Sequence, residues 1–508
     1  MHENEKEFGI KDFYYLSTRG RSEKVSSSAA IVKGIADDGG LYVPSYVPEI
    51  DKPYTELIKM HYRELAFYII EKFLPDFSKE ELKDFVCKAY DSKFDTPQIA
   101  PLVKVGDFNF LELHHGATAA FKDMALSLLP YLLVAALKKS GEKKEIVILT
   151  ATSGDTGKAA LESFSNVRGT KIIVFYPDKG VSLVQKQQMI TQEGNNTFVC
   201  AIKGNFDDAQ TSVKKIFSDK EFINYLTDKG YMVSSANSIN IGRLIPQVVY
   251  YIHAYLRLIE NNEIEDGQYI NIVVPTGNFG NILAAYYAMN MGLPVQRFLC
   301  ASNENNILYD FINTGVYDSR RELKLTISPS MDILISSNLE RLIFDLCKRD
   351  SNKLTELFNE LSTKGVFSID DEMKEKLNIF WGGVATEKQT LEAIKHAFEE
   401  YGYLMDTHTA VGYHVYKDYR EITMDRTKTV IVSTASPFKF PQSVLKAISP
   451  NYKGYENYNE FYMLEKLSEI TKHKIPAPLR GLADKKILHN NYCDTGNMKD
   501  FILKSLGL

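Results

Sequence analysis

Lys122 is the residue whose surroundings in this sequence could make a side chain a nucleophile. It lies in HHGATAAFKDMALSLLPYLL (residues 114–133), where Thr118 is the expected helix N-cap and apolar residues recur at helical spacing. In the first turn of such a helix the dipole opposes a cation, and burial acts in the same direction. The amine should therefore lose its proton easily, as imine formation requires. A lysine that reaches solvent from an apolar face is the plain alternative. Pro130 should kink the helix or mark a restart.

The loop PTGNFGN (275–281) could hold a phosphate. It follows the β-branched run YINIVVP (269–275) and precedes a helical segment, so the backbone N–H groups of Gly277 to Asn281 would form an anion-binding nest. The glycines follow G-x-x-G, and G-x-G-x-x-G is missing, so dinucleotide binding is disfavoured. A plain strand-to-helix turn is the alternative.

A second loop, TSGDTGKAA (152–160), also joins a strand to a helix. It lacks the first glycine and the final hydroxyl of a P-loop, which disfavours an NTPase. Ser153, Asp155 and Thr156 could bind a small anion, or the loop could be a structural N-cap turn. Lys158 is expected to be a solvated lysine, with a contact to a substrate phosphate as the alternative.

An activated lysine, a phosphate nest and a hydroxyl-rich loop together predict a phosphorylated aldehyde cofactor held as an imine, which is pyridoxal 5'-phosphate. No metal is expected, because His114 and His115 have no cysteine or carboxylate partner at ligand spacing.

Alternating strands and helices should position these loops. Continuous apolar runs of about six residues followed by helices are typical of parallel strands buried on both faces, and so of a doubly wound α/β core with one central sheet. The first 95 residues, with helices expected at 54–73 and 79–90, predict a helical domain, and the span after 450 predicts a tail. The expected strands are 145–150, 171–177, 196–202, 269–275, 297–302 and 428–435, and the expected helices between them include 207–217 and 243–259.

Composition limits the class of protein. With 508 residues, 44% hydrophobic and 25% charged, the chain is typical of a globular protein of several domains. A net charge of −5 disfavours nucleic-acid or membrane-surface binding, and no apolar stretch approaches membrane-spanning length. Five widely spaced cysteines without a C-x-x-C pair indicate reduced thiols. We expect a cytoplasmic protein that acts on a small molecule.

Motifs along about nine tenths of the chain resemble one enzyme family. They are STRG (17–20), GIADDGGLYVP (34–44), HHGATAAFKD (114–123), ATSGDTGKAA (151–160), SANSINIGRL (235–244), VPTGNFGN (274–281), PSMDI (329–333), DTHTAVG (406–412) and STASPFKF (433–440). In these segments the chain is similar to the threonine synthases, in the tryptophan-synthase-β-like group of pyridoxal-phosphate enzymes.

The resemblance implies a fold-type II enzyme with two α/β lobes. The helical N-terminal domain would cover 1–95, the catalytic core 96–440 with its smaller lobe at roughly 145–235, and a C-terminal extension 441–508. The implied activity is that of a carbon–oxygen lyase converting O-phospho-L-homoserine and water to L-threonine and phosphate. The alternative is a related phospho-lyase that gives 2-oxobutyrate, ammonia and phosphate. A monomer or homodimer is expected.

The resemblance also assigns roles to residues. Lys122 would carry the cofactor and move protons at Cα and Cβ, and Thr434 would place its hydroxyl on the pyridine nitrogen. The cofactor phosphate would be held by Gly277, Asn278, Phe279, Gly280 and Asn281. The substrate would be bound by Ser153, Gly154, Asp155, Thr156, Asn237 and Arg243. The chain departs from the family pattern at Ala117, Lys158 and Ser436, where proline, a small residue and histidine are usual.

Overall fold

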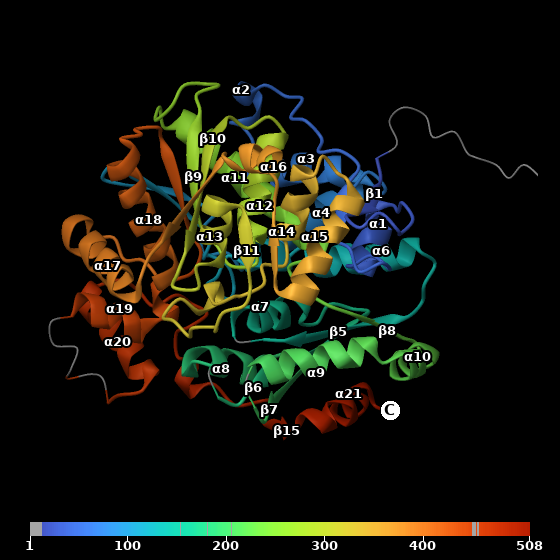
Figure 1. The fold of residues 1–508 in the computed structure, drawn as a ribbon. Helices are drawn as coiled ribbons and strands as arrows, with labels where there is room; N and C mark the ends of the chain where they lie inside the picture. The colour runs from blue at the N-terminus through green and yellow to red at the C-terminus, as the bar shows by residue number, and fades with distance from the viewer. Residues whose placement is uncertain (1–12, 153, 180, 205, 450–453, 455–456) are drawn as a thin grey trace, which may run out of the picture.

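The computed structural model describes residues 13–152, 154–179, 181–204, 206–449, 454 and 457–508 (Figure 1). Two separate sheets form its centre. The larger sheet has the order β13-β10-β9-β14-β4-β3, and the smaller has the order β15-β7-β6-β5-β8. Within these two sheets, neighbouring strands of the described residues are parallel except β3 and β4, which pair antiparallel at one edge of the larger sheet.

The strands of the larger sheet are β3 (Leu102–Val105), β4 (Phe108–Glu112), β9 (Ile270–Pro275), β10 (Val295–Ser302), β13 (Phe380–Val384) and β14 (Thr429–Ser433). Those of the smaller sheet are β5 (Glu145–Ala151), β6 (Thr170–Pro177), β7 (Thr197–Ile202), β8 (Tyr231–Ser234) and β15 (Asn491–Cys493). Antiparallel ribbons are formed by β1 (Tyr15–Ser17) with β2 (Tyr42–Pro44) and by β11 (Val316–Asp318) with β12 (Val366–Ser368).

The expectation of one central sheet is wrong, whereas the two α/β lobes are present. The six strands expected from apolar runs are all found, within about two residues of their predicted ends. Periodicity shows that a strand is buried on both faces but does not identify its neighbours. Here β5 to β8, which lie close together in sequence, pair with one another and leave the larger sheet to the remaining strands.

The helices of the N-terminal half are α1 (Ser27–Lys33), α2 (Tyr54–Leu57), α3 (Tyr62–Phe73), α4 (Lys79–Ala89), α5 (Asp123–Leu126), α6 (Leu129–Lys139), α7 (Asp155–Phe164), α8 (Leu183–Ile190), α9 (Phe206–Ser218), α10 (Lys220–Asp228) and α11 (Ile241–Glu260). Those that follow are α12 (Gly280–Asn290), α13 (Ile307–Thr314), α14 (Leu339–Leu346), α15 (Ser351–Lys364), α16 (Asp371–Leu377), α17 (Glu387–Tyr401), α18 (Thr407–Thr423), α19 (Pro441–Ile448), α20 (Glu460–Thr471) and α21 (Met498–Leu506). Among the described residues, no helix is long and apolar enough to cross a membrane.

Two expected helices are interrupted. The segment 54–73 divides into α2 and α3, and the second begins with a capping box between His61 and Glu64. The segment 118–133 divides into α5 and α6, and Pro130 stands at the start of α6, where its missing N–H costs nothing. The predicted N-cap at Thr118 is wrong: its hydroxyl donates to Asp123, and Lys122 occupies the N-cap position of α5.

Residues 13–95 pack on the larger lobe without a core of their own. Ile31, Leu65 and Ile69 belong to the same buried cluster as Val248 and Ile282. In Figure 1, α1, α3 and α4 lie beside α6 and α11. This layer covers the helices that lead into the site.

The C-terminal segment completes the smaller lobe. β15 adds a parallel strand beside β7, and Met498 and Ile502 of α21 are fully buried with the apolar residues of β5 and β6 (Figure 1). The last residues are therefore part of a lobe, which the expected tail did not indicate. The domain boundaries at 95 and 440 stay predictions.

Candidate active site

Lys122 and Thr434 lie side by side, although more than 300 positions separate them. An antiparallel bridge joins Ala120 to Ala435. The Phe121 N–H donates to the Thr434 carbonyl at 2.8 Å, and the Ser436 N–H donates to the Ala119 carbonyl at 3.0 Å. The start of α5 is thus fixed to the carboxyl end of β14, where ligands bind in open α/β sheets.

The Lys122 amine is buried among charged groups. Its side chain is 12% exposed, and Nζ lies 3.8 Å from Asp155 Oδ2 and 4.9 Å from the centroid of the Phe121 ring. Burial lowers the pKa of Lys122, Lys439 and Arg243 lower it further, and Asp155 opposes them. The sequence prediction of a readily deprotonated amine is therefore in agreement with the structure.

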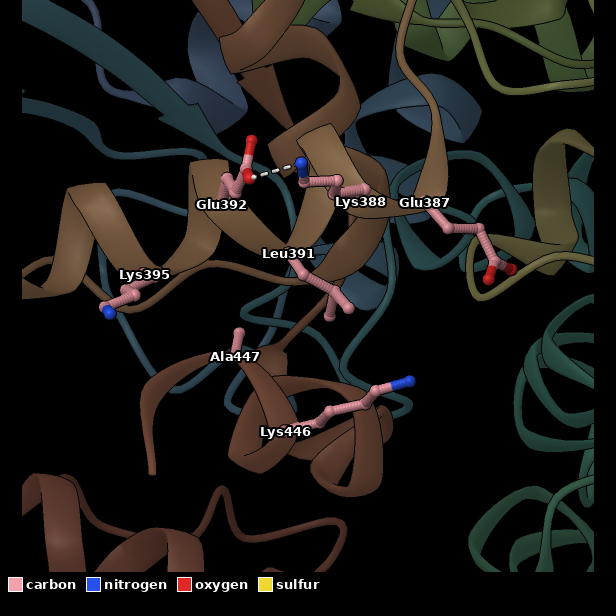
Figure 2. A pocket seen from close by; sticks show the side chains of 7 residues that line it. All are labelled: Glu387, Lys388, Leu391, Glu392, Lys395, Lys446 and Ala447. Carbon is pink, nitrogen blue, oxygen red and sulfur yellow. Dashed lines mark ion pairs between the residues drawn. The ribbon is translucent and has the colours of Figure 1, made fainter. Parts of the chain in front are cut away.

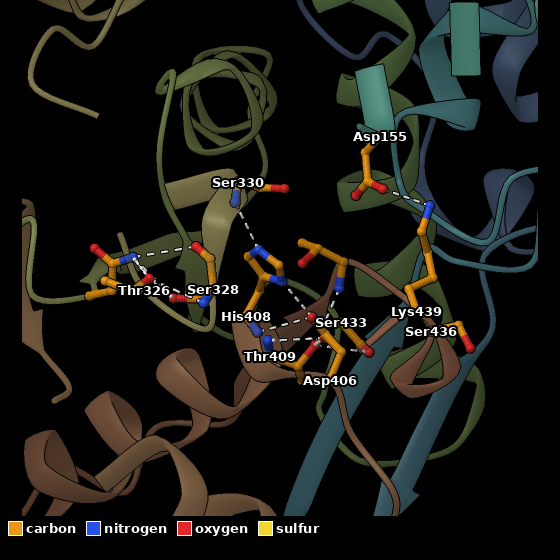
Figure 3. Close-up of polar contacts among 12 residues, drawn as sticks. Asp155, Thr326, Ser328, Ser330, Asp406, His408, Thr409, Ser433, Ser436 and Lys439 are labelled. Carbon is orange, nitrogen blue, oxygen red and sulfur yellow. Dashed lines mark hydrogen bonds and ion pairs between the residues drawn. The ribbon is translucent and has the colours of Figure 1, made fainter. Parts of the chain in front are cut away.

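Asp155 connects Lys122 to a second buried lysine. Its Oδ1 lies 2.6 Å from Lys439 Nζ (Figure 3). The same oxygen accepts a hydrogen bond from Gln185 Nε2 at 2.8 Å. Burial acts to raise the pKa of Asp155, but Lys439 and Lys122 outweigh burial and hold this pKa well below its usual range. The carboxylate is thus committed to cations and donors, and only the backbone at this position could bind a substrate carboxylate.

The start of α7 offers such backbone donors. Thr152 Oγ1 accepts hydrogen bonds from the Gly154 and Gly157 N–H groups, which fixes the turn. The N–H groups of Asp155 and Thr156 have no acceptor among the described residues, and they lie at the positive end of the helix dipole. Ser153, the remaining predicted residue of this loop, lies outside the described residues.

The predicted phosphate nest has the shape that an anion site needs. Phe279 is the N-cap of α12 with φ of 52°, and this left-handed residue turns successive N–H groups to one side. Within the part of the chain that the structure describes, the N–H groups from Gly277 to Asn281 have no acceptor. The Nδ2 of Asn281 is also buried and unpaired. The Oδ1 of the same side chain accepts hydrogen bonds from the hydroxyls of Tyr250 and Tyr251, which fixes the orientation of the amide. An anion with several oxygens would satisfy these donors.

Two residues that sequence reasoning missed hold the nest in place. Ser336 Oγ donates to the Gly277 carbonyl at 2.7 Å, and Asn338 donates to the Asn278 carbonyl through both its N–H at 3.0 Å and its Nδ2 at 2.8 Å. They lie before α14, far from the loop in sequence. No local pattern distinguishes them from ordinary turn residues.

A hydrogen-bond network links Ser330, whose backbone lies against Gly277 of the nest, to Thr434. The Ser330 N–H donates to His408 Nε2 at 3.1 Å, and His408 Nδ1 lies 2.7 Å from Asp406 Oδ2 (Figure 3). Thr409 Oγ1 donates to Asp406 and accepts from the Thr434 N–H at 3.3 Å. Both ring nitrogens of His408 are thus engaged within the protein, and His408 supports the site by holding Ser330 and Asp406 in place. Helix α18 begins at Thr407 and is capped by Asp406.

The hydroxyl of Thr434 is free for a ligand. Thr434 is 5% exposed, and its Oγ1 makes no hydrogen bond with any described residue. A hydroxyl that the protein leaves unpaired in the site is available to a ligand as donor or acceptor. It fits a heteroaromatic nitrogen beside Lys122.

The two more distant substrate candidates differ in burial. Arg243 is 4% exposed, donates through Nη1 to the Ala236 carbonyl at 2.8 Å, and has a buried, unpaired Nε. Burial lowers the pKa of Arg243 to about 10. Asn237 is exposed in the loop between β8 and α11, and its side chain makes no hydrogen bond with a described residue.

Two expectations about charged side chains need correction. Lys158 is not solvated: it is 8% exposed, and its Nζ pairs with Glu162 at 2.9 Å and contacts Gln192 Oε1. This amine is therefore occupied within the protein. His115 does have carboxylate partners, Glu112 at 2.9 Å and Asp95 at 2.6 Å.

The expected absence of a metal stays a prediction at His115 and its neighbours. Glu112, His114 and His115 offer ligand atoms within 4.8 Å of one another. Both ring nitrogens of His115 already contact carboxylates, and these contacts outweigh burial and raise the pKa of His115. In its protonated form the His115 imidazole would form ion pairs with both carboxylates and would offer no lone pair to a cation.

A surface groove of about 370 Å³ lies between α17 and α19 (Figure 2). Charged side chains line it, including Lys388 and Glu392, which pair at 3.7 Å, and Lys446. None of the predicted site residues contributes to it.

The described groups fit pyridoxal 5'-phosphate. Lys122, whose pKa is lowered, matches the aldehyde of this cofactor. The free N–H groups of the nest and the unpaired Nδ2 of Asn281 match its phosphate, and the free hydroxyl of Thr434 matches its ring nitrogen. Residues 96–360 match the family described as pyridoxal-phosphate dependent enzyme. With its two α/β lobes, the protein is a fold-type II pyridoxal-phosphate enzyme.

The remaining comparisons define the family within this class. Residues 14–90 match the family Threonine synthase N terminus, and 409–502 match Threonine synthase, C-terminal. Threonine synthase of Saccharomyces cerevisiae is 35% identical over 514 residues, covering 94% of this chain and 96% of that protein. The chain belongs to the threonine synthase family.

Solved structures and other relatives agree with this assignment. The structure of threonine synthase with bound PLP from Brucella melitensis superposes with a TM-score of 0.86 at 34% identity, covering 97% of this chain and 99% of that one. The yeast threonine synthase structure gives a TM-score of 0.87 at 33% identity with the same coverage. Threonine synthase-like 1 of Homo sapiens is 39% identical over 459 residues, covering 87% of this chain. The chain spans only 61% of the length of that relative.

Proposed function

We propose that this protein is a threonine synthase that converts O-phospho-L-homoserine and water to L-threonine and phosphate. The observation that carries the proposal is the placement of Lys122: a buried amine of lowered pKa, bridged to the Thr434 segment and facing the start of α7. The similarity to yeast threonine synthase over nearly the full length of both chains supports the reaction type.

In this proposal the chain's own groups bind and orient the reactants. The N–H groups of Gly277 to Asn281 and the amide of Asn281 hold the cofactor phosphate, and the Thr434 hydroxyl hydrogen-bonds the ring nitrogen. A hydroxyl at that position does not force the ring to carry a proton, as a carboxylate would. When bound, pyridoxal phosphate supplies the electron sink that stabilises negative charge beside the substrate imine.

The substrate would lie between Lys122 and the start of α7. The free N–H groups of Asp155 and Thr156 are suited to its carboxylate, and the buried Arg243 adds a positive charge that favours an anionic substrate. The neutral Lys122 amine takes and returns protons at Cα and Cβ. The roles of Ser153, Gly154 and Asn237 are proposed on family resemblance alone.

The test is to incubate the purified protein with pyridoxal phosphate and O-phospho-L-homoserine and to measure phosphate and amino-acid product together. Stoichiometric threonine and phosphate are expected, and Lys122→Ala should abolish both along with the visible absorption of the bound cofactor. Lys158→Ala is the matched control, because this lysine is equally buried but occupied by Glu162. Threonine formation that survives in Lys122→Ala would contradict the proposal.

The second candidate is a phospho-lyase that releases phosphate but yields 2-oxobutyrate and ammonia. The observation behind it is the 39% identity to proteins named threonine synthase-like 1, which equals the 39% identity to threonine synthase of Pseudomonas aeruginosa, so the degree of identity does not separate the two candidates. The same incubation separates the two, because 2-oxobutyrate replaces threonine as the carbon product.

We further propose that the protein acts in the cytoplasm as a monomer or homodimer. The five free cysteines support a reducing compartment. Fractionation of cells and light scattering of the purified protein test these two points.

A further inference from the structure

Lys439 is a fully buried lysine that the proposed reaction does not use. Its side chain is 0% exposed, and it follows Ser436 in the 3-10 helix η2 (Pro437–Lys439). Nζ donates to the Thr118 carbonyl at 3.0 Å and lies 2.6 Å from Asp155 Oδ1 (Figure 3). Burying an unpaired ammonium group costs much free energy, and the contact with Asp155 offsets this cost for Lys439.

Asp155 therefore lies between two lysines but is held closely by one of them. Lys439 Nζ is 2.6 Å from Oδ1, whereas Lys122 Nζ is 3.8 Å from Oδ2. Gln185 Nε2 donates to the same Oδ1 at 2.8 Å. Lys439 and Gln185 therefore make the shorter contacts with Asp155, and Lys122 makes the longest one.

We propose that Lys439 is a positioning residue that neutralises Asp155 and thereby leaves the Lys122 amine free to react with the cofactor aldehyde. If Lys439 were absent, Asp155 would have Lys122 as its only close cation and would hold that amine in its protonated form. The inference rests on the proposed role of Lys122 as the lysine that carries the cofactor.

The charges around Lys122 agree with this role. The charged groups that face it are Asp155 of α7, Lys439 of η2, Arg243 of α11 and Asp123 of α5. Lys439 and Asp155 cancel, and Arg243 has no carboxylate partner among the described residues. Burial raises the pKa of Asp123 to about 6 even though Thr118 hydrogen bonds oppose this, so Asp123 still carries a negative charge near pH 7 and acts in the same direction as Asp155. Burial, Lys439 and Arg243 together outweigh the two carboxylates and lower the pKa of Lys122, and Lys439 is the cation among them that pairs directly with Asp155.

The experiment measures the reactivity of Lys122 and does not depend on turnover. The full-length protein, freed of cofactor, is mixed with pyridoxal phosphate at a series of pH values, the imine is trapped with borohydride, and the modified Lys122 peptide is quantified by mass spectrometry. In Lys439→Met the trapping rate near about pH 7 should fall at least about tenfold, and its midpoint should move to higher pH. Lys439→Arg should keep the rate near that of the unmodified sequence.

Two further variants separate charge from structural support. Asp155→Asn should move the midpoint to lower pH, because it removes the carboxylate that favours protonated Lys122. Lys439→Met combined with Asp155→Asn should regain the rate, although the bond from Lys439 to the Thr118 carbonyl is still lost. If Lys439 had only a structural role, the double variant would not be expected to recover the rate.

Each outcome decides one proposal. An unchanged pH profile in Lys439→Met, or no recovery in the double variant, would overturn the role of Lys439. If Lys439→Met does not fold, the direction of the shift in Asp155→Asn decides. Absence of trapping at Lys122 in the unmodified sequence would instead overturn the role of Lys122 in the proposed function.

Discussion

Gly277 and Gly280 stand in the same nest but should respond differently to alanine. A Cβ at Gly277 would lie 2.6 Å from the backbone oxygen of Ser330, whereas a Cβ at Gly280 would lie 3.4 Å from the side-chain Nδ2 of Asn338. To reach 3.0 to 3.4 Å, the Gly277 backbone and Ser330 must separate by 0.4 to 0.8 Å. Ser330 is anchored by His408, and the Gly277 carbonyl is anchored by Ser336, so neither can move freely.

The structure sets the size of this effect. Forcing a methyl group into a packed site costs about 1–3 kcal/mol. If the nest backbone shifts, its N–H groups lose their alignment with the cofactor phosphate. A loss of binding free energy equal to this packing cost corresponds to about 5- to 150-fold weaker cofactor binding. Gly280→Ala meets ordinary van der Waals distance in the first turn of α12, so we expect little change in stability or affinity.

Two assays measure this pair of variants. Urea unfolding of the cofactor-free protein gives the change in unfolding free energy, and absorbance titration with pyridoxal phosphate gives the affinity. Equal behaviour of Gly277→Ala and Gly280→Ala in both assays would refute the assignment of this loop as a tightly held phosphate nest.

Three further predictions concern other parts of the molecule. Thr434→Val should leave the unfolding free energy within about 1 kcal/mol of the original, because the Thr434 hydroxyl has no partner among the described residues. The same variant should change the absorption spectrum of the bound cofactor, and an unchanged spectrum would argue against contact of this hydroxyl with the ring. Burial raises the pKa of Asp345 to about 6 from its ordinary value of 3.8, so the folded state holds a proton that the unfolded state loses, and stability falls as pH rises through that window. Asp345→Asn should therefore gain stability relative to the original across the same window in urea unfolding, and a constant difference would count against it. Ile502→Ala in α21 should lower the free energy of unfolding by about 2–5 kcal/mol, whereas substitution of the exposed Lys504 by alanine should leave it almost unchanged. Equal thermal stability of the two variants would show that α21 does not contribute to the stability of the smaller lobe.

The sequence identified the strands and the buried Lys122 for physical reasons that are local. Short apolar runs such as EIVILT and YINIVVP are typical of strands buried on both faces, and Lys122 stands at the start of a helix in an apolar segment. The nest from Gly277 to Asn281 was likewise predictable, because strand, glycine turn and helix follow one another directly.

What the sequence could not reveal depends on contacts between distant segments. The pairing of β5 to β8 into a separate sheet, the attachment of β15 to β7, and the support of the nest by Ser336 and Asn338 all join parts far apart in the chain. Lys158 was mistaken for a solvated lysine because its partner Gln192 lies more than thirty positions away.

The most direct test of the proposed reaction follows oxygen from labelled water. In ¹⁸O-water, loss of phosphate by cleavage of the Cγ–O bond leaves the phosphate unlabelled, and hydration at Cβ places one ¹⁸O in the threonine hydroxyl. We therefore predict singly labelled threonine and unlabelled phosphate from O-phospho-L-homoserine. Labelled phosphate with homoserine, or 2-oxobutyrate without threonine, would contradict the proposal.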